Sequence, residues 1–280
     1  MPTATEKRST FRRLHATGCF VMPNPWDVGT TRYLQHLGFP ALATTSAGAA
    51  FAIGCPDSDR AVSCETMLAH IADLAAASDV PMNADFGSGY ARDADGVASN
   101  VARCIATGVA GLSIEDRTGD AADPLYPLER AVERLRAARA AIDRNGGDVV
   151  LTGRAEGFLV GPPDLADTIR RLVAYAEAGA DCLYAPGIAT REQIDAVVRA
   201  VAPKPVNVLV GAAMALSQAD LAALGVRRIS VGGGLARAAW GAFMRAATMI
   251  AETGRFDGMA DAASGAELNR LFADDCARRR

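Results

Sequence analysis

Eight short apolar runs, separated by longer segments with helical spacing, constrain the fold of this chain more than any other feature. The runs are rich in Val, Ile, Leu and Ala and lie near residues 19–22, 39–45, 80–84, 109–114, 148–152, 181–185, 205–210 and 226–231. Nearly continuous apolar strands are typical of a parallel sheet covered by helices. Strict alternation of strand and helix favours closure into a barrel over an open doubly wound sheet. The sequence therefore predicts an α/β fold, a (β/α)8 TIM barrel.

Helix starts between the runs support this alternation. Thr190 is followed three residues later by Gln193, and Ser217 by Asp220, which is the spacing of a capping box. After the eighth run, residues 235–253 read as a helix, 254–264 as a connector and 265–278 as one further helix. We therefore expect a catalytic barrel over residues 1–253 and a connector with an additional C-terminal helix over 254–280.

The charge and the hydrophobic pattern of the sequence indicate which class of partner the protein binds. The formal net charge is −3, with basic and acidic residues interleaved, so no basic stripe indicates a nucleic acid. No apolar run approaches the roughly 20 residues that span a bilayer, and the N-terminal residues lack the apolar core of a signal peptide. Six cysteines occur without a C-x-x-C pair, which is typical of a reducing compartment. We expect a cytoplasmic protein that binds a small molecule, with no nucleic acid and no membrane partner.

Polar side chains appear where several apolar runs stop. Asn83 and Asp85 lie two residues apart at the end of the third run, so both side chains face the same side of a strand. Active sites of such barrels lie at the carboxyl ends of the strands. Oxygen donors of this kind suit Mg²⁺, with Mn²⁺ as an alternative. Asp85 could instead cap a turn or the next helix.

The fourth and fifth runs also end on charged residues. Glu115 and Asp116 end the fourth run and could complete a metal's water shell, or pair with an arginine. Arg154 ends the fifth run, and its planar guanidinium can grip a carboxylate at two points. Glu156 could then orient Arg154 or join the metal's outer shell. Alternatively, Arg154 only neutralises an acidic barrel mouth.

Other signals are weaker or negative. None of the three histidines falls at a strand end, so histidine is not expected to be the general acid or base. The triplet Gly232-Gly233-Gly234 follows the eighth run, where many barrels bind phosphate, but a tight turn explains it about as well. No zinc spacing and no G-x-G-x-x-G after a strand is present.

Several of these segments together resemble the isocitrate lyase/phosphoenolpyruvate mutase superfamily. The matching segments span most of the barrel and follow the family's order: NPWD (24–27), TTSAG (44–48), GCPD (54–57), NADFGSGY (83–90), SIEDR (113–117), TGRAEGF (152–158), GADCLYAPG (179–187) and KPVNVL (204–209).

The resemblance implies roles for individual residues. Substrate binding falls to Thr45, Ser46, Ala47, Asp85, Arg154 and Asn207, metal binding to Asp85, Asn83 and Glu115, and the catalytic group to Arg154, Glu115 and Asp57. In the family, Asp57 would lie in the metal's water shell and Arg154 would hold the substrate carboxylate. The family's D-A-D metal segment reads Asn83-Ala84-Asp85 here, so an amide replaces the first carboxylate and Asp85 becomes the surer ligand.

One loop departs from the family pattern. Lyases of the family carry K-[KR]-C-G-H after the strand that ends at Asp116, and its cysteine acts as the acid or base. Here the loop reads RTGDAADPLYPLE, without Lys, Cys or His. The mutase branch's lysine and asparagine are also missing. The chain is therefore similar to the mutase-like branch, and isocitrate or methylisocitrate cleavage by that mechanism is not expected.

The residues that remain are those that handle a 2-oxo acid and its enolate. Our leading prediction is a Mg²⁺-dependent lyase or decarboxylase that acts on a small 2-oxo or 2-hydroxy carboxylic acid. The alternatives are a mutase or hydrolase of phosphonopyruvate-like substrates, and a 2-oxo-acid binding protein with little turnover.

The additional helix suggests an assembly. Leu268, Leu271 and Phe272 fall at helical spacing. In the family that the chain resembles, a C-terminal helix packs against a neighbouring subunit. We therefore expect a homodimer, or a homotetramer of helix-swapped dimers.

Overall fold

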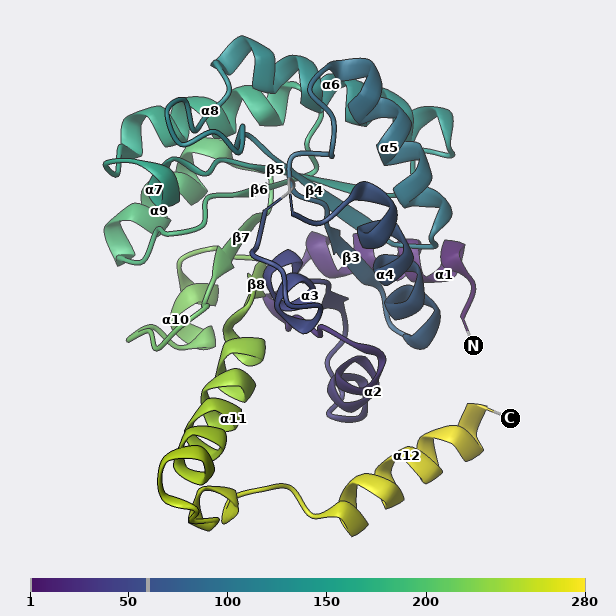
Figure 1. The fold of residues 1–280 in the computed structure, drawn as a ribbon. Helices are drawn as coiled ribbons and strands as arrows, with labels where there is room; N and C mark the ends of the chain where they lie inside the picture. The colour runs from purple at the N-terminus through teal and green to yellow at the C-terminus, as the bar shows by residue number, and fades with distance from the viewer. Residues whose placement is uncertain (1, 59–60, 280) are drawn as a thin grey trace.

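The computed structural model describes residues 2–58 and 61–279 and shows eight parallel strands in a nearly closed barrel (Figure 1). The strands are β1 (Phe20–Met22), β2 (Leu42–Ala43), β3 (Met82–Asp85), β4 (Gly111–Glu115), β5 (Val150–Arg154), β6 (Cys182–Tyr184), β7 (Val206–Leu209) and β8 (Arg228–Ser230). Each lies within or next to one of the eight predicted runs, so the predicted TIM barrel is confirmed. Residues 1, 59–60 and 280 of the two predicted units lie outside the described residues.

Helices follow the strands and cover the outside of the sheet. They are α1 (Ala4–Ala16), α2 (Val28–His36), α3 (Ser46–Ala52), α4 (Cys64–Ala77), α5 (Ala94–Ala106), α6 (Leu128–Arg144), α7 (Gly157–Val160), α8 (Leu165–Glu177), α9 (Arg191–Val201), α10 (Gln218–Ala223), α11 (Gly234–Thr253) and α12 (Gly265–Arg279), with the 3-10 turn η1 (Asp257–Met259). Thr190 and Ser217 form the capping boxes that the sequence predicts.

The strand order explains why the barrel is only nearly closed. Neighbouring strands pair from β1 through β8 and β7 down to β2, and β1 and β2 are the two ends of this order. A backbone bond from the Ala43 N–H to the Pro23 carbonyl, 3.1 Å long, links the two ends. All eight carboxyl ends therefore meet on one face of the barrel.

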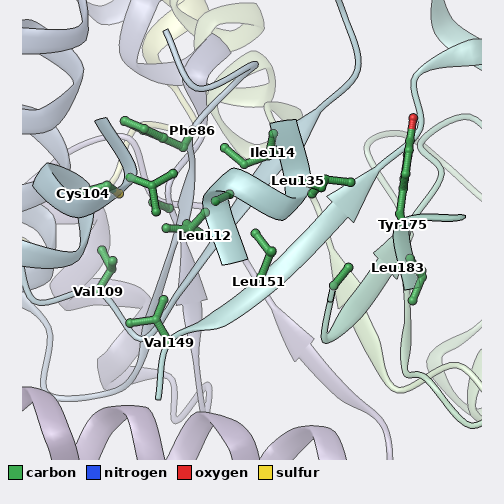
Figure 2. Packing of buried hydrophobic residues seen from close by; sticks show 14 of the residues in the cluster. Phe86, Cys104, Val109, Leu112, Ile114, Leu135, Val149, Leu151, Tyr175 and Leu183 are labelled. Carbon is green, nitrogen blue, oxygen red and sulfur yellow. The ribbon is translucent and has the colours of Figure 1, made fainter. Parts of the chain in front are cut away.

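The larger core lies between the sheet and its helices. Leu112 and Ile114 of β4 and Leu151 of β5 are buried there, in one cluster with Leu135 of α6 (Figure 2). These residues alternate along the strands with polar residues that face the barrel interior. Alternate residues of the apolar runs thus face the outer core, and the residues between them face the barrel interior, where polar side chains lie toward the carboxyl ends and a smaller apolar core lies at the other end.

Helix α1 closes the opposite end of the barrel. Its Arg8 and Arg12 side chains donate to the carbonyls of Val109 and Asp148, which precede β4 and β5. Phe11 is fully buried in a second, smaller core inside the barrel. A Cβ atom at Gly111 would lie 2.6 Å from the Phe11 ring, so glycine is needed where this ring enters. Helix α1 therefore leaves only the carboxyl end of the barrel open.

The C-terminal elements extend beyond the barrel. In Figure 1, α11 points away from β8 and α12 lies beyond α2. Of the 20 residues of α11 only Ala236 is buried. Helix α12 contacts its own barrel through ion pairs that join Arg32 to Asp275 and Arg279 to Asp79. The additional C-terminal helix that the sequence predicts is thus present.

Candidate active site

A polar cavity opens at the carboxyl ends of the strands. It encloses about 620 Å³, including its open mouth. Its walls are Met22, Asn24, Ala43, Thr44, Thr45, Ser46, Ala47, Asp57, Asn83, Asp85, Ser113, Arg154, Tyr184, Asn207, Leu209, Arg228, Ser230, Gly232 and Gly233. All the predicted substrate-binding, metal-binding and catalytic residues therefore line one cavity, except Glu115.

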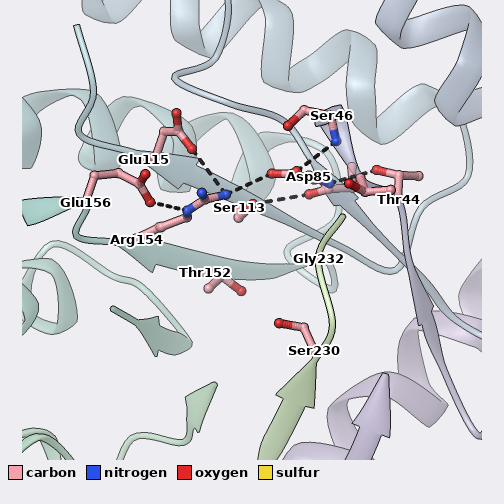
Figure 3. A network of polar contacts seen from close by, with 12 residues as sticks. Thr44, Ser46, Asp85, Ser113, Glu115, Thr152, Arg154, Glu156, Ser230 and Gly232 are labelled. Carbon is pink, nitrogen blue, oxygen red and sulfur yellow. Dashed lines mark hydrogen bonds and ion pairs between the residues drawn. The ribbon is translucent and has the colours of Figure 1, made fainter. Parts of the chain in front are cut away.

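Arg154 lies between Asp85, Glu115 and Glu156 in the upper part of this cavity (Figure 3). We call this part the mouth and define it by these four residues and Asp57 of the cavity wall. The Arg154 Nη1 lies 3.1 Å from Asp85 and 3.2 Å from Glu115. Its Nε donates to Glu156. Glu115 therefore reaches the site through Arg154 and not through the cavity wall.

The mouth carboxylates determine the charge state of Arg154. Burial lowers the pKa of this guanidinium, but the negative charges of Glu156, Glu115 and Asp85 outweigh burial and hold the pKa well above its ordinary value. Glu156 is fully buried, and burial raises its pKa despite the opposing effect of Arg154. Arg154 is thus a permanent cation, locked in one orientation by three acidic partners.

Asp85 links β3 to the start of α3. One carboxylate oxygen accepts from the backbone N–H of Ser46 at 2.9 Å while the other faces Arg154. Asp57 lines the same cavity, and burial and the negative charge of Asp85 raise the pKa of its carboxyl. Two carboxylates that repel each other across a cavity favour a bound cation.

The oxygen donors that β3 turns into the barrel, Asp85 at the mouth and Asn83 beside Gly111 below it, are of the type that suits Mg²⁺. Asn83 is buried, and its Oδ1 has no hydrogen-bond partner among the described residues. This orphan oxygen lies on the same face of β3 as the Asp85 carboxylate, and the set contains only hard oxygen donors, as Mg²⁺ prefers. No group of three or more His, Cys, Asp or Glu side chains in residues 2–58 and 61–279 forms a ready-made metal site. Waters or a substrate would have to supply the remaining ligands.

The predicted substrate cradle is also assembled. Thr45 caps α3 by accepting from the Gly48 N–H, which leaves Ser46 and Ala47 along the cavity wall. Asn207 of β7 lies lower in the cavity, where its amide donates to the Ser230 hydroxyl at 2.9 Å. Backbone, hydroxyl and amide groups thus line one side of the cavity opposite Arg154.

A buried network behind the mouth fixes Glu156. Asp116 accepts from the backbone N–H of Glu156 at 2.8 Å, from Tyr175 at 2.6 Å and from Arg171 at 3.1 Å. Asp116 is 2% exposed and lies outside the cavity wall. Asp116 therefore positions the end of the strand that carries Arg154. Its position next to Glu115 in the sequence did not indicate this role.

Two wall residues, Arg228 and Ser230, were not singled out from the sequence, whereas Tyr184 was expected to be a pocket residue that affects specificity. Arg228 and Ser230 both face the barrel interior from β8. The sequence signal for this orientation was the spacing of two residues between a charged and a polar side chain within an apolar run, because such residues share one face of a strand. Asn24 accepts from the N–H of Gly232 at 2.8 Å, so the first N–H of the glycine triplet is used within the protein. Tyr184 lines the cavity, and burial raises its pKa to about 12.

The loop that departs from the family pattern folds back on itself. Arg117 and Leu125 form an isolated antiparallel bridge, and the Tyr126 N–H donates to the Asp116 carbonyl at 2.8 Å. Arg134 of α6 stacks over the Tyr126 ring. The loop is thus pinned at its base beside the mouth.

Comparisons with known proteins agree with this geometry. Residues 11–251 match the phosphoenolpyruvate phosphomutase family. The chain belongs to this family. An oxaloacetate decarboxylase from Paraburkholderia xenovorans is 32% identical over 233 residues, which cover 80% of this chain and 74% of the relative.

Solved structures of family members superpose closely. A candidate lyase/mutase from Burkholderia cenocepacia J2315 is 48% identical, has a TM-score of 0.92 and covers 96% of each chain. A phosphonopyruvate hydrolase in complex with oxalate and Mg²⁺ is 26% identical, with a TM-score of 0.84 over 98% of this chain and 97% of that one. The predicted membership of the isocitrate lyase/phosphoenolpyruvate mutase superfamily, and with it an enzyme, is confirmed.

A membrane-spanning segment was not expected. None of the helices within the described residues is both long enough and apolar enough to cross a membrane.

Proposed function

We propose that this family member is a Mg²⁺-dependent lyase or decarboxylase that acts on a small 2-oxo or 2-hydroxy carboxylic acid. The observation that carries the proposal is the Arg154 guanidinium, held in the cavity wall by acidic partners and facing a cradle of hydrogen-bonding groups. An arginine fork recognises a carboxylate in two places. The Ser46 and Ala47 side of the cavity would then contact the 2-oxo or 2-hydroxy group.

Asp85 and the Asn83 amide oxygen would hold the metal, with Asp57 and Glu115 in its water shell. When bound, Mg²⁺ supplies positive charge that stabilises a developing enolate. The acidic mouth keeps Arg154 fixed, so the bound carboxylate needs little reorganisation of the protein.

Decarboxylation suits the altered loop better than cleavage of a 2-hydroxy acid. Cleavage next to a hydroxyl needs a base to remove the hydroxyl proton, whereas a β-carboxylate is already ionised and leaves as CO₂. The loop at residues 117–129 has no Lys, Cys or His to act as that base. The oxaloacetate decarboxylase relative supports the same preference.

A second candidate is phosphonopyruvate hydrolysis or rearrangement. The similarity to phosphonopyruvate hydrolase favours it, as does the presence of Gly232 and Gly233 in the cavity wall. The missing loop residues of the mutase branch count against it.

A substrate panel tests the proposal. The purified protein is incubated with oxaloacetate, 2-methylmalate and phosphonopyruvate, with Mg²⁺ or with EDTA, and pyruvate, CO₂ and phosphate are measured. We expect Mg²⁺-dependent release of CO₂ from oxaloacetate or of pyruvate from 2-methylmalate. Turnover of phosphonopyruvate alone, to pyruvate and phosphate or to phosphoenolpyruvate, would support the second candidate, and saturable binding without product would identify a binding protein.

We also propose that the protein is a homodimer, or a homotetramer of helix-swapped dimers, in which residues 254–280 form the exchanged unit. Trp240, Phe243 and Met244 of α11 are 40%, 61% and 59% exposed, and Leu268 of α12 is 41% exposed. Exposed apolar side chains such as Trp240 and Phe243, whose rings contact each other, are typical of a subunit interface. Deletion after Gly254 should give monomer or aggregate. A truncated protein that stays soluble with the parent's mass in light scattering would refute the swap.

A further inference from the structure

Arg228 is a buried cation deep in the cavity. It is the first residue of β8, is 2% exposed and lines the cavity wall. Its Nε donates to Asn207 Oδ1 at 2.9 Å and its Nη2 to Thr152 Oγ1 at 3.0 Å. Its Nη1 lies 3.3 Å from the Nε2 of His15. We call this group the floor of the cavity: Thr152, Asn207, Arg228 and Ser230, with His15 beneath them.

The charge of Arg228 has no anionic partner in residues 2–58 and 61–279, since all three contacts are with neutral groups. His15 faces the Phe11 carbonyl through Nδ1 at 2.7 Å, so Nδ1 carries the ring proton and Nε2 accepts from Arg228. Burial and the positive charge of Arg228 lower the pKa of His15 to about 3, which keeps the ring neutral. A buried charge without a counter-ion is unfavourable, and a ligand anion would relieve this.

Arg228 also fixes the direction of the hydrogen bonds above it. Because a guanidinium only donates, Asn207 must turn its Oδ1 toward Arg228 and its NH₂ group toward Ser230. The Ser230 hydroxyl oxygen accepts from that NH₂ group. Its hydroxyl hydrogen is therefore donated elsewhere, either to the Tyr184 oxygen or into the cavity. If Tyr184 accepts it, the phenolic hydrogen remains for the cavity. Either way the floor offers a donor to a ligand.

From this geometry we infer that the floor is a second anion subsite, built on Arg228, and that the substrate carries a second anionic group at the end distal to its Arg154-bound carboxylate. The inference rests on the proposed function and narrows its substrate class to dianionic acids. The floor's donors and its uncompensated cation suit a distal carboxylate, and a distal phosphonate shares that chemistry.

Malate and lactate provide a matched test, because they differ by one carboxylate at the distal carbon. Calorimetric titration in buffer with Mg²⁺ should show that the parent binds malate more tightly than lactate. Arg228→Met should reduce this ratio by about tenfold or more and change lactate affinity little, as expected for loss of a hydrogen bond to a charged group. Arg227→Met, on the neighbouring half-buried arginine that donates to the Gly18 carbonyl, is the control.

A second variant separates binding from structure. Asn207→Asp keeps the acceptor for Arg228 and adds the missing negative charge, so the fold should remain at least as stable while the preference for malate falls. This variant also carries the test if Arg228→Met does not fold. Titration with oxaloacetate and phosphonopyruvate, which differ only in the group on C3, tells whether a carboxylate or a phosphonate is the better distal group, and pyruvate, which has neither, is the reference.

The outcomes distinguish the subsite from the proposed function. A parent that binds lactate as tightly as malate, or variants that weaken both ligands equally, would overturn the subsite. Arg154→Lys should weaken both ligands together, and this result supports the proposed function whatever happens at the floor. A parent that binds none of these acids would overturn both.

Discussion

Arg154 at the mouth and Arg228 on the floor are both buried cations of one cavity, but their surroundings differ in charge. Arg154 faces the carboxylates of Asp85, Glu115 and Glu156. Arg228 contacts an amide, a hydroxyl and a neutral imidazole. The comparison shows that one barrel interior can hold the same side chain either as a compensated, fixed group or as a cation that still lacks a counter-ion.

The difference follows from where each residue lies along its strand. Arg154 ends β5, next to the strand ends and loops that carry acidic residues. Arg228 begins β8, at the end that α1 closes with Phe11 and His15. Acidic residues thus surround the cation at the open end, whereas at the closed end aromatic and apolar residues fill the barrel interior and Asp148 and Asp181 pair with the arginines of α1.

The largest expected effect is at the mouth. Asp85→Ala should abolish Mg²⁺ binding, because it removes the only carboxylate on the cavity face of β3 and leaves Arg154 closer to the remaining oxygen donors. Calorimetric titration with Mg²⁺ measures the effect, with Asp195→Ala on the surface of α9 as the control. Unchanged affinity would remove Asp85 from the metal site.

Arg154→Lys keeps the charge and removes the planar fork. We expect about a hundredfold weaker binding of pyruvate or oxaloacetate, because a lysine cannot make the two parallel bonds. Arg170→Lys, on an exposed arginine of α8 paired with Asp167, should have no effect. If Arg154→Lys binds like the parent, Arg154 serves only to neutralise the acidic mouth.

At the closed end, Gly111→Ala should destabilise the fold by about 1–3 kcal/mol through overpacking. The added Cβ would lie 2.6 Å from the Phe11 ring and 2.7 Å from Asn83 Oδ1. Chemical denaturation measures the effect, and Gly161→Ala, which meets open space, is the control. Equal stability of the two variants would show that Phe11 of α1 can shift to accommodate the added methyl group at little cost in free energy.

Asn83→Asp adds a negative charge to the barrel interior, between the mouth and the closed end. It should tighten Mg²⁺ binding by about tenfold, because it places a negative charge beside a hard cation. The Asn83 Oδ1 has no partner among the described residues, but the substitution removes the 3.1 Å bond from Asn83 Nδ2 to the Ala84 carbonyl, so the stability of the variant is measured alongside. A titration that gives the parent's affinity would place residue 83 outside the metal's shell.

The smallest expected effect is a pH dependence from the floor. The pKa of His15 is lowered from 6.5 to about 3, so the unfolded chain takes up a proton that the native protein does not. The stability associated with His15 is therefore present above pH 6.5 and is lost as the pH falls toward 3. His15→Gln should reduce the loss of stability between pH 7 and pH 5.5 by roughly 1 kcal/mol. Equal losses in parent and variant would contradict a neutral His15.

The sequence by itself determined the elements and the open end of the barrel. Eight apolar runs predicted eight strands, because burial between sheet and helices demands continuous apolar residues. Asn83, Asp85 and Arg154 stood out because parallel strands bring their carboxyl ends to one face. These signals are local, because each can be read from one segment of the sequence alone.

The tertiary structure alone decided which charges meet. Arg154 could pair with acids at three strand ends, and only the register of β3, β4 and β5 brings Asp85 and Glu115 within reach. Arg228 lies inside an apolar run, and its alternation with Ser230 indicates a polar interior position but not which groups surround it. Its importance depends on β7, β5 and α1 meeting around it after barrel closure, and contacts between residues 76 and 213 positions apart leave no local pattern.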